Sequence, residues 1–94
     1  MMVRVKFFTV LREVTGKREE EIEFPSVVTV KGLLGRLSEK YGSQFDDYVY
    51  GDGGEVRGHL QFLVNGKNIE MLQGFKTKLK DGDEFAILPP VGGG

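Results

Sequence analysis

The chain has 94 residues with three Pro, fourteen Gly and no Cys, and its formal net charge is −1 at pH 7. That length suits a single domain, and the lack of Cys excludes a disulfide framework, Fe–S clusters, thiolate zinc sites and a catalytic thiol. A charge near zero disfavours nucleic-acid binding, because phosphate affinity requires clustered Lys and Arg. The sequence contains no membrane-span-like apolar run and no signal-peptide pattern, so we expect a soluble cytoplasmic domain that contacts no membrane.

The N-terminal part predicts a β-hairpin. In residues 3–8, Val3, Val5 and Phe7 alternate with Arg4, Lys6 and Phe8, which is typical of a half-buried strand. In residues 19–24, Glu20, Ile22 and Phe24 alternate with Glu19, Glu21 and Glu23, and this second strand ends at Pro25. The connecting residues 9–18 are expected to form a loop with one helical turn near 11–14.

An amphipathic helix is predicted next. Thr29 is a suitable N-cap and Gly42 a suitable C-terminal residue. Apolar residues recur at helical spacing between them, at Val30, Leu33, Leu34, Leu37 and Tyr41. Gly32 and Gly35 weaken the helix, and we expect them where helix and sheet approach closely.

The rest of the chain predicts further strands. Residues 43–58 indicate a loop with at most a short helix, and residues 60–64 a third strand. Asn65-Gly66 is a strong hairpin-turn signal, after which Ile69 is expected to begin a short return strand. Residues 84–88 form the last predicted strand.

The order of elements favours an α+β fold, a mixed sheet with one main helix on one face. We predict one domain over residues 1–88. An extended tail follows at residues 89–94, because Pro89-Pro90 offers no N–H to continue a ladder.

The side chains do not assemble an independent active site. His59 is the only histidine and has no predicted partner group. Carboxylates of residues 19–21 point to alternating faces of a strand, so a solvated charge run is favoured over a cation site. Asp81-Gly82-Asp83 lacks the other ligands of a calcium loop. We therefore expect this chain to bind no metal and no cofactor.

The C-terminal glycines are one candidate functional feature. Residues 92–94 are Gly-Gly-Gly, and extended chain from Pro89 to Gly94 reaches about 18–20 Å. Such a stalk can carry a terminal carboxylate into a partner, where it becomes an acyl donor once activated. The alternative is a frayed end or a cloning scar.

A second candidate feature is a set of apolar residues predicted on the face away from the helix. Phe8, Leu63 and Leu88 belong to three different strands and share the outward parity with Ala86. Contiguous exposed apolar surface often marks a protein interface. Alternatively, residues 43–58 cover these side chains, or they are scattered singly.

Several motifs together resemble the small subunit of molybdopterin synthase. They are the opening residues 3–8, Leu11–Gly16, Leu63-Val64-Asn65-Gly66, residues 79–85 with their Lys-Asp-Gly-Asp turn, and Pro89-Pro90-Val91-Gly92-Gly93-Gly94. The resemblance spans nearly the whole chain. It implies a ubiquitin-like β-grasp fold and a sulfur-carrier function.

The resemblance also implies a reaction and partners. An E1-like adenylating enzyme uses ATP to activate the carboxylate of Gly94, which is converted to a thiocarboxylate. The tail then enters the large subunit of molybdopterin synthase, in a heterotetramer built on a large-subunit dimer, and sulfur passes to a pterin precursor of the molybdenum or tungsten cofactor. The residues expected to contact partners are Gly93, Gly92, Val91, Pro90, Pro89, Leu88, Phe8 and Leu63.

Other functions share this fold and tail. A sulfur carrier for thiazole or tRNA thiolation, or a ubiquitin-like modifier, uses the same activation step with another acceptor. Gly92 makes a triple glycine where the family requires two, and residues 67–78 are longer than in a minimal member. A non-catalytic β-grasp binding module is the remaining alternative.

Overall fold

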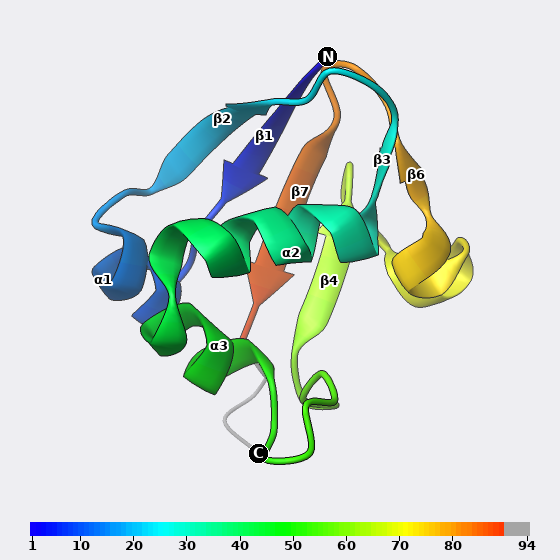
Figure 1. The fold of residues 1–94 in the computed structure, drawn as a ribbon. Helices are drawn as coiled ribbons and strands as arrows, with labels where there is room; N and C mark the ends of the chain where they lie inside the picture. Colours follow the sequence, from blue (N-terminus) through cyan, green and yellow to red (C-terminus); the bar gives the residue numbers. More distant parts are fainter. Residues whose placement is uncertain (90–94) are drawn as a thin grey trace.

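A five-stranded mixed sheet forms the centre of the protein in a computed structural model, which describes residues 1–89 (Figure 1). The strand order is β2-β1-β7-β4-β5, in which β1 and β7 are parallel and the other neighbouring pairs antiparallel. The elements are β1 (Met2–Lys6), α1 (Val10–Thr15), β2 (Glu19–Glu23), β3 (Val28–Thr29), α2 (Val30–Tyr41), α3 (Ser43–Val49), β4 (Gln61–Val64), β5 (Lys67–Asn68), the 3₁₀ helices η1 (Ile69–Met71) and η2 (Gly74–Lys76), β6 (Lys78–Leu79) and β7 (Glu84–Leu88).

The strand pairing places the last strand in the middle of the sheet. β1 forms the predicted hairpin with β2, in which Val3 is opposite Ile22. β7 inserts between β1 and β4, so that Phe85 is opposite both Val5 and Val64. An α+β mixed sheet with a helix on one face is therefore confirmed.

The core lies between this sheet and α2, which crosses one face (Figure 1). The inward side chains of β1, β4 and β7 and the leucines of α2 are buried together. α2 begins where predicted, because the side-chain oxygen of Thr29 accepts a hydrogen bond from the Gly32 N–H at 3.1 Å. Burial of this apolar face is the main source of stability for so small a domain.

The expectation for the two helix glycines is wrong. A Cβ at Gly32 would lie 2.7 Å from Cγ2 of Val28, in β3, whereas a Cβ at Gly35 would meet nothing within 4 Å. The close approach therefore involves the short strand before the helix rather than the sheet beneath it.

Two local predictions also need correction. The first strand ends at Lys6, so Phe8 follows the strand instead of belonging to it. Ile69 does not begin a strand: the return strand is Lys67–Asn68, and Ile69 starts η1 because the Asn68 side chain caps the Glu70 N–H. The prediction of at most a short helix in residues 43–58 agrees with the seven-residue helix α3, which buries Phe45 and Val49.

A second, two-stranded sheet was not predicted. β3 pairs with β6, with Val28 opposite Leu79 and Thr29 opposite Lys78. Within residues 1–89, no helix has both the length and the apolar character that a bilayer span requires.

Candidate functional site

The C-terminal residues continue from the central strand of the sheet. Leu88, the last residue of β7, is opposite Gln61 of β4, and half-buried Pro89 follows it. Because β1 runs parallel to β7, the C-terminal ends of both strands lie at the same end of the sheet (Figure 1). Anything attached beyond Pro89 is therefore anchored to the central strand of the sheet, which is paired on both sides.

The outward side of β7 changes from polar to apolar toward its end. Glu84, Ala86 and Leu88 are half-buried on this side, and Phe85 and Ile87 are buried on the other. Ala86 is opposite Lys6 of β1 and Leu63 of β4, so the three side chains form one row across the outer face.

Four residues make up what we call the outer-face patch: Phe8, Leu63, Ala86 and Leu88. Leu63 is diagonal to Leu88, because Leu63 is opposite Ala86 and Gln61 is opposite Leu88. Phe8 lies two residues beyond Lys6, as Leu88 lies two beyond Ala86. All four side chains are partly exposed. The predicted facing of Leu63 and Leu88 is therefore what the structure has, whereas Phe8 lies beyond the end of β1 and no strand pairing defines its face.

α3 does not form a layer over this patch. It packs against α1 and α2, on the helix side of the sheet (Figure 1). Neighbouring strands bring Leu63, Ala86 and Leu88 together, so the alternative that the apolar residues are scattered singly is wrong for these three.

Arg12 contacts Phe8 of the outer-face patch, a role that was not predicted from the sequence. Its Nε donates a hydrogen bond to the Phe7 carbonyl at 3.0 Å, and its guanidinium carbon lies 5.4 Å from the centroid of the Phe8 ring. This cation–π contact orients an aromatic side chain that lies outside any strand. The four-residue step from Phe8 to Arg12, at the start of a predicted helical turn, was the available signal.

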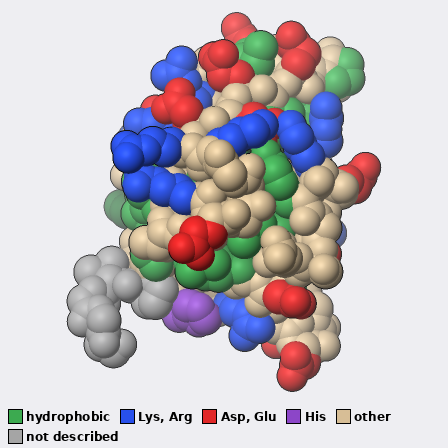
Figure 2. All heavy atoms as spheres, turned by 90° about the vertical axis from the view of Figure 1, so that its left-hand side faces the viewer, with side chains coloured by type: hydrophobic (Ala, Val, Ile, Leu, Met, Phe, Trp, Pro, Cys, Tyr) green, Lys and Arg blue, Asp and Glu red, His purple; other side chains and the backbone are tan. Residues whose placement is uncertain are grey.

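Ion pairs occupy the other end of the outer face. Arg4 lies 3.6 Å from Glu19 and 3.5 Å from Glu21, and Lys6 lies 3.4 Å from Glu84. Seen from the β2 edge, basic and acidic side chains gather in the upper half of the molecule, with hydrophobic side chains reaching the surface below them (Figure 2). On this outer face, the partly exposed apolar side chains thus lie toward the end of the sheet where β7 finishes.

The other polar residues considered from the sequence do not build a catalytic or metal site. The Asp81 carboxylate accepts a hydrogen bond from the Met2 N–H, and Asp83 accepts from the Lys80 N–H and the Asn65 side chain, so both organise turns. His59 is exposed before β4. Within the described residues, no three His, Asp or Glu side chains gather as metal ligands.

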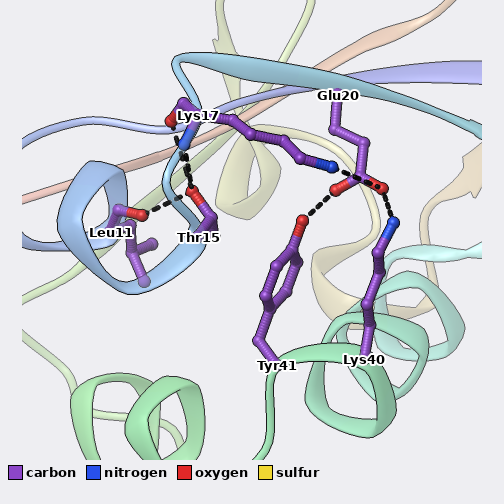
Figure 3. A network of polar contacts seen from close by, with 6 residues as sticks. All are labelled: Leu11, Thr15, Lys17, Glu20, Lys40 and Tyr41. Carbon is purple, nitrogen blue, oxygen red and sulfur yellow. Dashed lines mark hydrogen bonds and ion pairs between the residues drawn. The ribbon is translucent and has the colours of Figure 1, made fainter.

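Glu20 departs from the expected solvated charge run. Its side chain is only 9% exposed, and it accepts hydrogen bonds from the Tyr41 hydroxyl and the Lys40 ammonium, with the Lys17 ammonium 3.6 Å away (Figure 3). Burial alone would raise the pKa of Glu20, but the two hydrogen bonds and the charges of Lys17 and Lys40 lower it overall. Burial and the Glu20 carboxylate raise the pKa of Tyr41. This cluster ties β2 to the end of α2.

Five of the predicted site residues lie outside the described part of the chain: Pro90, Val91, Gly92, Gly93 and Gly94. Their roles in activation and partner contact, and those of Pro89, Leu88, Leu63 and Phe8 in docking, stay predictions. The structure does show that Pro89, Leu88, Leu63 and Phe8 lie around the end of β7.

Comparisons with known proteins identify the class. Residues 5–94 match the ThiS family. The chain is 33% identical to small archaeal modifier protein 3 of Haloferax volcanii, over all of both chains, and 32% identical to the molybdopterin synthase sulfur carrier subunit of Escherichia coli, covering 99% of this chain and 100% of that protein.

Solved structures agree with the sequence comparisons. The crystal structure of SAMP1 from Haloferax volcanii superposes with a TM-score of 0.84 at 31% identity over all of both chains. A chain from the Amycolatopsis orientalis BexX/CysO complex gives a TM-score of 0.78 at 26% identity, covering 98% of this chain and 99% of that one.

These matches define a ubiquitin-like β-grasp protein. The chain belongs to the ThiS family of ubiquitin-like sulfur carriers. Its relatives include proteins named as modifiers and proteins named as sulfur carriers, and one similar structure comes from a BexX/CysO complex. Family membership therefore defines the kind of protein but not the final acceptor.

Proposed function

We propose that this chain is the sulfur-carrying small subunit of a molybdopterin synthase, with the carboxylate of Gly94 as its working group. One observation carries the proposal: the sequence Pro-Pro-Val-Gly-Gly-Gly follows directly from the central strand β7, beside an exposed apolar patch. The similarity to the molybdopterin synthase sulfur carrier subunit of Escherichia coli, which covers 99% of this chain, supports it.

The proposed chemistry needs an activating enzyme, because a carboxylate is a poor acyl donor. An E1-like enzyme lets a Gly94 carboxylate oxygen attack the α-phosphorus of ATP, which breaks the α–β phosphoanhydride and releases pyrophosphate. Hydrosulfide then attacks the carbonyl carbon and displaces AMP, which leaves the thiocarboxylate and releases a proton. ATP belongs to the activating enzyme. This chain contributes the acyl group and its anchorage rather than a side-chain acid or base.

The outer-face patch supplies the docking surface in this proposal. Phe8, Leu63 and Leu88 bury apolar area against the activating enzyme or the large subunit, while residues from Pro89 to Gly94 enter the partner's site. Glycine has no Cβ, so partner walls can close directly on the backbone there. The expected assembly is a heterotetramer with a large-subunit dimer, in which the sulfur of Gly94 passes to a pterin precursor.

A protein modifier is the second candidate, because the relatives include small archaeal modifier protein 3 at 33% identity and the SAMP1 structure at a TM-score of 0.84. Activation is the same, but a lysine amine then attacks the activated carbonyl, so that an isopeptide bond forms and the leaving group departs. Sulfur transfer to thiazole or tRNA precursors also shares the first step. A binding module that does not use its C-terminal carboxylate would lack this activation step.

Intact mass of the protein from its native cells tests the proposal. We expect a fraction of the molecules to gain the mass of one oxygen-to-sulfur exchange, located on Gly94 by fragmentation. Deleting Gly94 should abolish cofactor formation and leave the fold unchanged by circular dichroism. Glycine remnants on lysines of other proteins, with no thiocarboxylate, would favour the modifier. Cofactor formation by a C-terminally extended, unprocessed protein would overturn the sulfur-carrier proposal.

A further inference from the structure

Three large apolar side chains are exposed together around η1 and η2. The exposed fractions are 82% for Met71, 40% for Leu72 and 38% for Phe75. In the described part of the chain, only Val10 and Val27 are comparably exposed among large apolar residues. The segment 69–76 lies beside β6, on the side of the molecule away from β2 (Figure 1). These side chains are thus concentrated in one short segment, far from the β2 edge.

The backbone that carries them is held in place by local hydrogen bonds. The Asn68 side-chain oxygen accepts from the Glu70 N–H at 2.9 Å, and the hydroxyl of buried Thr77 accepts from the Gln73 N–H at 3.0 Å. The Leu72 N–H donates to the Ile69 carbonyl. An apolar surface on a fixed backbone loses little conformational entropy when it binds.

A hollow opens next to the exposed aromatic ring. Phe75 meets Phe62 edge to face, with 5.6 Å between ring centroids. Both rings, with Leu60 and Ile69, line a surface cavity of about 390 Å³. That volume accommodates an apolar side chain as an anchor, which is how interface hot spots are commonly built.

The segment that carries these side chains has a charge opposite to that of the whole chain. Residues 67–80 contain four Lys and one Glu, a formal charge of +3, whereas the full chain has −1. The four side chains, at Lys67, Lys76, Lys78 and Lys80, are exposed, and within residues 1–89 none of them forms an ion pair. The basic residues of the outer face, Arg4 and Lys6, are by contrast paired with glutamates. Free cations around an apolar surface attract a partner of negative charge.

We propose that the surface of residues 67–80, which carries Met71, Leu72 and Phe75 together with the four lysines, binds an acidic segment of a partner protein. One large apolar side chain of that segment fills the hollow beside Phe75, and flanking carboxylates pair with the lysines. This surface shares no residue with the outer-face patch. The proposal does not depend on whether Gly94 carries sulfur.

A display library of random linear peptides, selected against the whole protein, tests this site without presuming a partner. We expect the selected peptides to be rich in Asp and Glu around an aromatic or large aliphatic residue. Their affinity should fall at least about tenfold in Met71→Ser and in the double variant Lys76→Glu/Lys78→Glu. Raising the salt concentration should also weaken them. Val27→Ser and Arg18→Glu are the matched controls, an exposed apolar and an exposed basic residue elsewhere, and should change nothing.

Three results would overturn the proposal. One is a selection that yields no binders, or binders without acidic enrichment. Another is selected peptides that bind the Met71→Ser and double-lysine variants as tightly as the unchanged protein. The third is binding to vesicles of phosphatidylcholine and phosphatidylglycerol that those same variants abolish, which would assign the surface of residues 67–80 to an anionic membrane instead.

Discussion

The hydroxyl of Tyr41, the last residue of α2, donates a hydrogen bond to the carboxylate of Glu20 on the edge strand β2 (Figure 3). Lys40 and Lys17 bring two positive charges to the same carboxylate. The contact joins two residues that are 21 positions apart in the sequence. It closes one end of the layer between helix and sheet.

Tyr41→Phe isolates the hydrogen bond from the packing. The substitution keeps the edge-to-face ring contact with Phe7, whose centroid is 6.0 Å away, and removes only the hydroxyl. We expect a loss of about 1 kcal/mol in the free energy of unfolding, because a partly buried carboxylate loses a donor. Urea denaturation measures it. Tyr48→Phe, another half-buried tyrosine, is the control and should be nearly neutral.

Glu20 gives the stability a dependence on acid pH. Its pKa in the folded protein is below the ordinary value of 4.5, so its contribution is complete above that value and is lost as the pH falls through the folded pKa. The difference in unfolding free energy between the unchanged protein and Glu20→Gln should therefore be largest near pH 7 and shrink below about pH 5. Urea titrations at several pH values measure it, and a difference that is constant with pH would contradict the assignment.

The larger elements could be predicted because their patterns are long or chemically distinctive. Alternation over residues 84–88 fixed both the strand and its two faces, and helical spacing with Thr29 as the cap fixed α2. The pairs Val28–Thr29 and Lys78–Leu79 are too short to show a period, so the second sheet was invisible in the sequence. α3 had a weak signal, the four-residue step from Phe45 to Val49.

The candidate site likewise has some features that could be predicted from the sequence and others that could not. The alternation of side chains along a strand is sufficient to predict that Leu63 and Leu88 face outward. The stacking of Arg12 on Phe8, the partly buried state of Glu20 and the exposure of Met71 depend on how turns and helix ends are placed in space. Local sequence patterns carry little of that information, because tertiary contacts decide it.

Asn65 combines an unusual backbone with two side-chain hydrogen bonds. Its φ is +51°, its Nδ2 donates to Asp83 and its Oδ1 accepts from the Glu84 N–H, both at 2.9 Å. Asn65→Gly keeps the backbone and loses only the side-chain bonds, which should cost about 1 kcal/mol. Asn65→Ala adds left-handed strain of about 1 kcal/mol more. Thermal or urea unfolding of the pair measures the difference, and equal stabilities would mean that the backbone at this turn is not strained.

The outer-face patch makes the sharpest link between structure and function. Phe8 and Leu88 are partly exposed beside the end of β7, so truncating either removes apolar area that a partner would bury rather than core contacts. With the activating enzyme, we expect Phe8→Ala or Leu88→Ala to weaken binding at least about tenfold, or 1.4 kcal/mol. The free energy of unfolding should fall by less than about 1 kcal/mol. Val27→Ala, which shortens an exposed side chain elsewhere, should alter neither. Calorimetric titration and urea denaturation of the same samples separate the two quantities, and a large loss of stability with unchanged binding would show that these side chains serve the core instead of a partner.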